Sequence, residues 1–240
     1  MSIRSNPGDR RARALVVGFA VLIALVTGLV WAFCAGGADA DRLARSGDRA
    51  ERIEAVDRLW KSGGRKSREM LVRLSGDKDL QVAVTAVCAL GHTGDAESLL
   101  EKILRDRAKP ARVRSEAAAQ LGRFGPQARE RLCGVLQEEP DPVVRMGAAK
   151  GLWRLCDAHT APNLVTALSD PDRRVRTHTF KALNRLMVCR FPYDPERPPD
   201  QQQQVLGEIK RYLGLGAHPT GAPTGQAPCA TSVRKTAQRP

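Results

Sequence analysis

The chain has 240 residues, of which 42% are hydrophobic and only 4% aromatic, so it can form one or two ordinary domains with an aliphatic core. Its formal net charge of +13 predicts attraction to an acidic protein surface, an anionic polymer or a lipid headgroup layer. The six cysteines show neither a C-x-x-C motif nor a paired spacing, which argues against a disulfide scaffold and against a zinc module.

The first expected element is a transmembrane helix over residues 14–34. These 21 residues carry no charge, and at about 1.5 Å per residue they can cross a hydrocarbon core of about 30 Å. Small and acidic residues follow the run, whereas four arginines precede it: Arg4, Arg10, Arg11 and Arg13. The positive-inside rule therefore predicts that residues 1–13 are cytoplasmic and that the rest of the chain is extracytoplasmic.

A cleaved signal peptide is the alternative for the same segment. Residues 38–40 read Ala-Asp-Ala, which matches the A-x-A pattern of signal peptidase sites, so the chain would be secreted after cleavage near Ala40. The apolar region of a signal peptide usually has only about 7 to 15 residues, which favours a retained anchor. In either case residues 35–47 form a linker.

A repeat of 31 residues organises the chain after this linker. The pattern V-x-x-x-A-x-x-x-L begins at Val82, Val113, Val144 and Val175, and one period earlier Glu51 takes the place of the valine. An aspartate three residues before the valine predicts a helix N-cap in four of the five copies. Second apolar runs at helical spacing lie between these helices, at residues 70–77, 99–106, 131–138 and 163–170.

Each repeat is therefore expected to be a helical hairpin, and the fold class is all-α. One hairpin cannot bury its apolar faces alone, but stacked neighbours share a continuous core. The sequence thus predicts an alpha-alpha superhelix, a solenoid of about five 31-residue hairpins that follows the single transmembrane helix.

The motif D-x-x-V-R-x-x-A-A-x-x-L in residues 141–152 closely resembles HEAT-like repeats, and residues 172–183 follow it with Thr179 and Phe180 in the two alanine positions. The resemblance covers residues 48 to about 187 and is closest to the short repeats that also occur in phycobilisome lyases. It implies a scaffold that binds other proteins, and lyase activity does not follow from sharing the repeat.

The expected repeat domain extends over residues 48–215. A proline-rich segment at 189–200 cannot continue a helix, and a capping helix is expected over 200–213, beginning at Asp200. Residues 216–240 contain too few large apolar residues to fold and are expected to be a disordered tail.

The sequence gives no indication of an enzyme. None of the four histidines belongs to an H-E-x-x-H motif, and no nucleophile, base and oxyanion donor can be assigned together. We therefore expect no catalytic residue, no metal, no cofactor and no small-molecule substrate.

Two basic columns recur with the repeat. The first directly follows the valine, and an arginine there in HEAT-like repeats commonly pairs with a neighbouring aspartate to form a structural ladder between repeats. The expected members are Arg52, Arg114, Arg145 and Arg176, with Asp141, Asp170 and Asp172 as partners, and Asp170–Arg176 and Asp172–Arg176 are the candidate pairs.

The second column lies ten residues after the valine and is joined by two lysines on the same helical face. We call its members the basic stripe: Lys61, His92, Arg123, Lys150, Arg154, Lys181 and Arg185. Basic residues also favour helix C-termini for electrostatic reasons, so the stripe is either a set of solvated helix ends or a surface for an acidic partner protein. Binding of an anionic polymer, nucleic acid included, is the alternative function, and the scarcity of aromatic residues for base stacking argues against it.

Overall fold

The computed structural model describes residues 39–187 and 189–215, which contain helices and no strand. The chain divides into two compact units, one ending at Ala96 and the other beginning at Glu97. The expected transmembrane helix and C-terminal tail lie outside the described residues. Among the helices within them, none combines the length and the apolar character that crossing a membrane requires.

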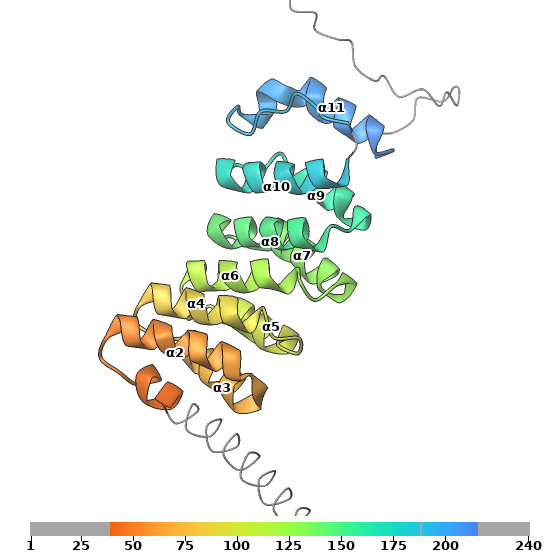
Figure 1. The fold of residues 1–240 in the computed structure, drawn as a ribbon. Coiled ribbons are helices and arrows are strands. Elements are labelled where there is room, and N and C mark those ends of the chain that lie inside the picture. The colour runs from red at the N-terminus through yellow and green to blue at the C-terminus, as the bar shows by residue number, and fades with distance from the viewer. Residues whose placement is uncertain (1–38, 188, 216–240) are drawn as a thin grey trace, which may run out of the picture. The chain divides into compact units, whose positions relative to one another are not determined.

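The N-terminal unit contains α2 (Arg49–Ser62), α3 (Gly64–Leu74) and α4 (Leu80–Leu90), which pack against one another (Figure 1). Two consecutive glycines, Gly63 and Gly64, turn the chain between α2 and α3 with positive φ angles of 64° and 80°. Glycine adopts this conformation without the steric cost that a Cβ brings, which explains why the turn contains glycine.

The C-terminal unit stacks its helices in two layers (Figure 1). One layer contains α6 (Ala111–Leu121), α8 (Pro142–Leu155) and α10 (Arg173–Leu186). The other contains α5 (Glu97–Arg105), α7 (Arg129–Glu138) and α9 (Ala161–Ala167). Short 3-10 turns, η1 (Pro126–Ala128) and η2 (Ala158–Thr160), lead into α7 and α9. A third, η3 (Pro199–Gln202), leads into α11 (Gln203–Tyr212), which contacts α9.

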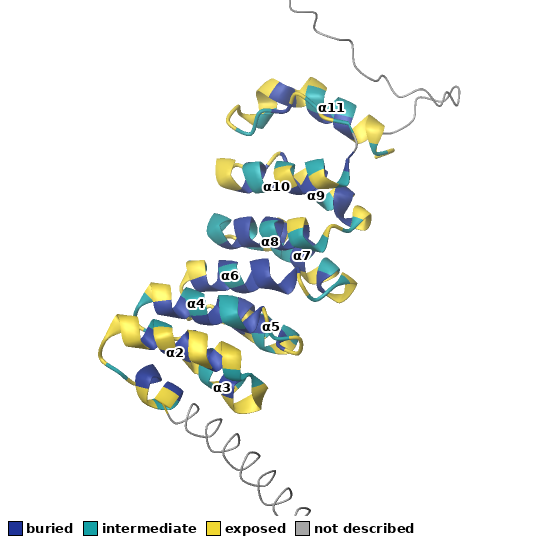
Figure 2. Ribbon diagram, viewed as in Figure 1, coloured by how far each residue is buried: buried dark blue, intermediate teal, exposed yellow. Residues whose placement is uncertain are grey.

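The repeat columns supply the core of both units. The valines of the four complete copies are 0% exposed, and so are Ala55, Ala86, Ala117, Ala148 and Thr179 four residues after the anchor. Glu51, which replaces the valine in the first copy, is exposed. Figure 2 shows α6 as the most completely buried helix of its layer, because α5 and α8 both pack against it. The prediction of an all-helical repeat fold is therefore confirmed.

Aspartate N-caps begin four of the repeat helices. The carboxylates of Asp48, Asp79, Asp141 and Asp172 each accept a hydrogen bond from a backbone amide in the first turn of α2, α4, α8 and α10. These bonds satisfy amides that have no partner within the helix. Pro110 occupies the same column before α6, and that helix has no side-chain cap.

Helices α6 and α8 approach each other at their backbones. A Cβ on Gly147 would lie 2.2 Å from the carbonyl oxygen of Ser115, and a Cβ on Gly151 would lie 2.5 Å from that of Ala118. Both distances are far shorter than any real contact of a Cβ, so only glycine fits at these two positions. The close approach fixes the stacking of these two repeats.

The proline-rich segment closes the stack after α10. The Tyr193 hydroxyl donates a 2.6 Å hydrogen bond to the carbonyl oxygen of Leu168, and the buried Gln202 amide holds the backbone of Asp194 and Arg197. The α-helix that follows begins at Gln203. The expectation that Asp200 caps it is wrong, because Asp200 lies within η3.

Candidate functional site

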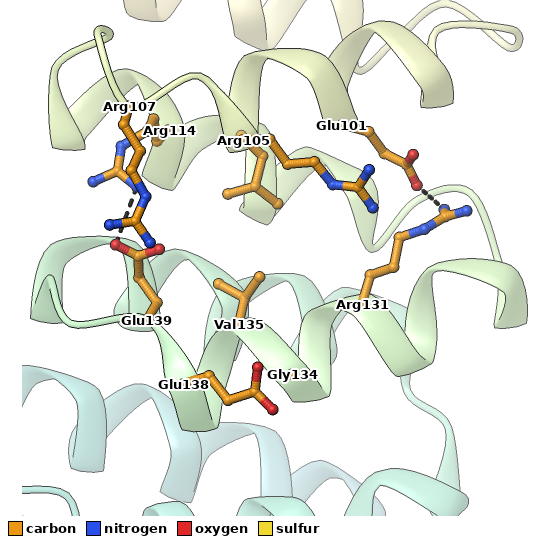
Figure 3. A pocket seen from close by; sticks show the side chains of 10 residues that line it. Glu101, Arg105, Arg107, Arg114, Arg131, Gly134, Val135, Glu138 and Glu139 are labelled. Carbon is orange, nitrogen blue, oxygen red and sulfur yellow. Dashed lines mark hydrogen bonds and ion pairs between the residues drawn. The ribbon is translucent and has the colours of Figure 1, made fainter.

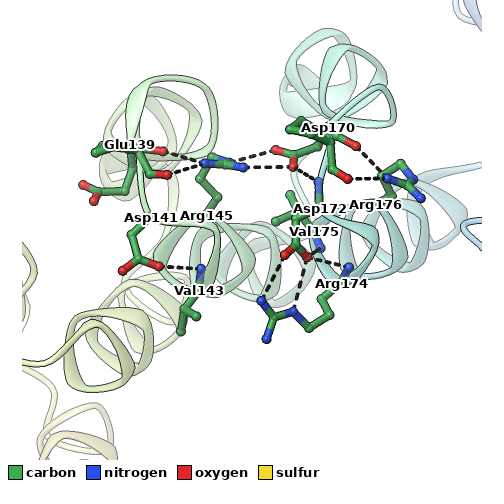
Figure 4. Close-up of polar contacts among 11 residues, drawn as sticks. Glu139, Asp141, Val143, Arg145, Asp170, Asp172, Arg174, Val175 and Arg176 are labelled. Carbon is green, nitrogen blue, oxygen red and sulfur yellow. Dashed lines mark hydrogen bonds and ion pairs between the residues drawn. The ribbon is translucent and has the colours of Figure 1, made fainter. Parts of the chain in front are cut away.

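The arginines after the repeat valines bind the loops on both sides of their helix. Arg145 donates from Nε and Nη2 to the two carboxylate oxygens of Asp170, at 2.8 and 3.0 Å, and from Nη1 to the carbonyl oxygens of Glu139 and Pro140 (Figure 4). Arg52 repeats this arrangement with the carboxylate of Asp77 and with two carbonyl oxygens of the loop before α2. The guanidinium thus joins one inter-helix loop to the next.

The other two ladder arginines depart from this arrangement. Arg114 donates from Nη1 to the Glu139 carboxylate, at 3.1 Å, and within the described residues its buried Nε has no hydrogen-bond partner. Arg176 pairs with no carboxylate among the described residues. Its Nε and Nη2 donate to the carbonyl oxygen of Pro195, so the proline-rich segment supplies the acceptor that a following repeat would provide.

The aspartates take different roles from those expected. Arg176 contacts Asp170 through the backbone carbonyl oxygen, since the Asp170 carboxylate is bound by Arg145 (Figure 4). Asp172 pairs with Arg174 and caps α10, and the bonds to Arg174 lower its carboxyl pKa. Asp141 is an N-cap of α8. Neither candidate pair of Arg176 is therefore formed between side chains: Asp170 pairs with Arg145, 25 residues earlier, and Asp172 pairs with Arg174.

The sequence carried a signal for these pairs. An acid stands five residues before the valine in three copies, as Asp77, Glu139 and Asp170, and each lies 25 residues after its arginine. The second copy has Ala83 in place of the arginine, and 25 residues later the chain has Ala108 in place of the acid. Both members of one pair have thus been replaced by alanine.

The two stripe residues of the N-terminal unit have local partners. Lys61 forms an exposed ion pair with Asp57 at 2.7 Å, one helical turn away. His92 packs its ring edge-on against Trp60, with the ring centroids 5.9 Å apart. Neither arrangement forms a basic surface.

Three stripe arginines of the C-terminal unit come together. Arg123, Arg154 and Arg185 belong to successive repeats and line one surface depression of 430 Å³. Among the residues that the structure describes, Gly122, Gly125 and Leu155 complete the lining, and none of these carries a carboxylate. We call this site the arginine depression.

Lys150 and Lys181 lie on the same helical layer as the arginine depression. Burial, and then the positive charge of Arg112, lower the pKa of Lys150, and Arg154 and Lys181 add to this effect. His178 lies near both lysines, and burial followed by their charges lowers its pKa to about 4. This face therefore holds several positive charges, which Glu116 opposes, and His178 on the same face is neutral at pH 7.

A second hollow of 290 Å³ is electrostatically different (Figure 3). Two of the four arginines that line it pair with acids of the same hollow: Arg114 pairs with Glu139, and Arg131 pairs with Glu101. The hollow lies between α5 and α7, and it mixes acidic with basic side chains, because Glu138 lines it as well. Within the described ranges, no three histidine, cysteine, aspartate or glutamate side chains gather as a metal site would require.

Comparison with known proteins identifies the repeat. A family model for HEAT repeats matches residues 98–184, which extend from α5 into α10. No curated protein matches the chain. The chain therefore carries HEAT-like repeats in its C-terminal unit, and such repeats usually act as protein-interaction scaffolds without catalytic activity.

Proposed function

We propose that this chain is a membrane-anchored scaffold whose HEAT-like repeats bind another protein, with an acidic surface, on the extracytoplasmic side. The observation that carries the proposal is the convergence of Arg123, Arg154 and Arg185 in one depression, whose described lining residues include no acid. Three successive repeats thus place their guanidinium groups together on one surface, and this favours a partner that presents acidic groups.

The electrostatics of the neighbouring face support an acidic partner. Lys150 and Lys181 add positive charge on α8 and α10, and like charges on one face steer an anionic surface mainly through the association rate. The 31-residue period supports assigning the repeats to the short type shared with phycobilisome lyases, and we assign no lyase activity to them.

Binding of an anionic polymer is the second candidate. It is favoured by the exposed Trp153 ring, which could stack with a base, but the Arg185 guanidinium already lies 4.6 Å from the centre of that ring. The salt dependence of the binding affinity distinguishes the two candidates. The affinity for a nucleic acid falls steeply as the salt concentration rises, and the slope grows with the number of phosphates contacted.

The anchor is proposed from the sequence of residues 14–34 and the arginines before it. Ala40 is 1% exposed within a helical segment at 39–44, so cleavage after it would remove a packed residue; this supports a retained anchor over a secreted chain. A C-terminal reporter active only in the cytoplasm would overturn the orientation, and a mature chain beginning at Asp41 would overturn the anchor.

Proximity labelling in the native cell tests the scaffold proposal. We expect a small set of labelled proteins with acidic surfaces, and we expect charge reversal of Lys150 and Lys181 together to reduce their labelling. The matched control reverses Arg65 and Arg173, which are exposed and lie elsewhere. Equal labelling by both double variants would contradict the proposed surface.

A further inference from the structure

We infer that an acidic partner binds at a group of three cations, Arg112, Lys150 and Lys181, and that this binding is coupled to the protonation of His178. The inference rests on the proposed scaffold function and deepens it, because it names the groups that meet the partner and a condition that regulates the contact. We call the three cations the cation cluster. Arg112 lies on α6, Lys150 on α8 and Lys181 on α10, so three successive repeats contribute one cation each.

The fold brings the cation cluster and the imidazole together. Helices α6, α8 and α10 pack side by side in one layer (Figure 1). Lys150 and Lys181 are equivalent positions of successive repeats, and His178 stands three residues before Lys181, on the same face of α10. Gly147 lets the backbones of α6 and α8 approach closely, and the charge of Arg112 acts on Lys150 across this contact.

The positive charge of the cation cluster exceeds the negative charge beside it. In the part of the chain that the structure describes, no ion pair joins any of its three members to an acid. After burial, the largest influences on Lys150 come from three cations, Arg112, Arg154 and Lys181, and from one acid, Glu116. Arg112 and Lys181 are exposed and Lys150 is half-buried, so a partner can reach all three. A carboxylate of the partner therefore meets positive charge that the fold leaves unpaired.

His178 lies in the field of this cluster and is neutral at pH 7. Burial lowers the pKa of the half-buried imidazole first, the charges of Lys150 and Lys181 lower it further, and the resulting pKa is about 4. After burial, the two lysines are thus the main obstacle to protonation of the ring.

The other elements packed against α10 place no competing charge on His178. Helix α9 contains no ionisable side chain. Arg174, one turn before His178, is paired with Asp172. The proline-rich segment contacts α10 through the rings of Phe180 and Tyr193, and Phe180 follows His178 by two residues, about 200° around the helix. The protonation of His178 therefore responds to what binds at the lysines.

A bound carboxylate changes the protonation of His178. A negative charge among the lysines offsets their repulsion of the imidazolium, so it raises the pKa of His178 in the complex above that in the free chain. The imidazole takes this proton from the solvent, and the complex then binds one proton more than its separate components. By linkage, the affinity rises as the pH falls through the pKa of the complex, and this gain is complete near the pKa of the free chain.

The spacing of the cation cluster suits an acidic polypeptide. Packed helices lie about 8–10 Å apart, and alternate residues of an extended chain are about 7 Å apart. A segment in which every second residue is acidic can therefore cross the layer and bring a carboxylate to each repeat. Lysine ammonium groups adapt to such a segment, because each presents three rotatable donors.

The first experiment measures binding of a fluorescent ten-residue peptide of alternating Asp and Gly to the purified full chain in neutral detergent. Replacing the cation cluster (R112Q, K150Q and K181Q) should weaken binding about tenfold or more at pH 6.5. The matched control K102Q, R105Q and R107Q removes the same charge from exposed residues of α5 and the loop after it, and it should weaken binding by less than about threefold. Equal losses in the two triple variants would overturn the site.

The second experiment tests the coupling to His178. Between pH 7.5 and pH 5.5 the aspartates of the peptide stay ionised, and the affinity of the wild type should rise about threefold or more. H178Q should abolish this rise. The control H159Q removes an exposed histidine that pairs with Asp157, and it should keep the rise. In NMR titrations, peptide binding should raise the pKa of His178, and an unchanged pKa or an equal rise in H178Q would overturn the coupling.

The remaining outcomes also decide between the proposals. If the triple variant of the cation cluster unfolds, K150Q and K181Q replace it, and each should weaken binding about threefold. A single-stranded oligonucleotide that binds more tightly than the peptide, and that depends on the same cations, would overturn the assignment to an acidic polypeptide. If the peptide does not bind but the native partner is still captured, the site inferred here fails and the scaffold proposal stands.

Discussion

Arg145 and Asp170 form a bidentate ion pair that joins the loops before α8 and α10. Its two N–O distances are 2.8 and 3.0 Å, and both side chains are nearly buried. The same guanidinium donates to the carbonyl oxygens of Glu139 and Pro140. The pair therefore organises two successive loops rather than adding an isolated surface charge contact. Asp170 raises the pKa of Arg145 further, so the guanidinium stays charged at any pH at which the protein is folded.

Replacing Arg145 by Gln should lower the free energy of unfolding by about 3–5 kcal/mol, because it leaves the Asp170 carboxylate buried without its partner. Urea denaturation followed by circular dichroism measures this loss. The control is Arg58→Gln, which breaks an exposed pair with Glu54 and should cost less than about 1 kcal/mol. Similar losses in the two variants would show that the pair has no special structural role.

The repeat columns were predictable because a 31-residue period places the same side chain in the same environment in each copy. The valine, alanine and leucine columns are buried accordingly. The partners of the ladder arginines were not predicted. A sequence period identifies equivalent positions in successive repeats, whereas each of these pairs joins an arginine of one column to an acid of another column. The depression around Arg123, Arg154 and Arg185 was expected only as a stripe, since its concave shape depends on how helix ends meet.

The backbone contact between α6 and α8 gives a second prediction. Gly151→Ala should lower the free energy of unfolding by about 3 kcal/mol, because the new Cβ would meet the Ala118 carbonyl oxygen and force the helices apart. Gly134→Ala is the matched control within α7, where a Cβ meets nothing within 4 Å, and it should stabilise by about 0.5–1 kcal/mol through helix propensity. Chemical denaturation of both variants measures the contrast, and a stable Gly151→Ala protein would contradict the close approach.

Thr179 gives a third prediction because it brings a hydroxyl into the alanine column. The side chain is 0% exposed, and within the described residues its Oγ1 has no hydrogen-bond partner. Thr179→Val keeps the shape and removes the unsatisfied group, so it should raise the free energy of unfolding by about 1 kcal/mol. The comparison is Thr177→Val on the same helix, where the hydroxyl donates to the Arg173 carbonyl oxygen and no gain is expected. A loss of stability in Thr179→Val would mean that the hydroxyl has a partner.

The titration of His178, which lies near the lysines of the basic face, makes the folding stability depend on pH. Burial and the charges of Lys150 on α8 and Lys181 on α10 lower its pKa from 6.5 to about 4. In the unfolded chain the imidazole takes up a proton as the pH falls through about 6.5, whereas in the folded chain it stays neutral until about 4. The unfolded state therefore binds more protons between these values, and folding stability falls as the pH is lowered through this window.

His178→Gln should remove this part of the pH dependence. Between pH 7.5 and pH 4, the stability of the wild type relative to the variant should fall by about 1–2 kcal/mol, less than the full pKa shift implies because the ring is only half-buried. Melting curves of both proteins across this range measure the difference in stability. The carboxylates contribute equally to the pH dependence of both proteins, so their contribution cancels in this difference. Lys150→Met should raise the pKa of His178 and shrink the effect, since it removes one of the two nearby charges. An imidazole that titrates near 6.5 by NMR in the folded wild type would contradict both expectations.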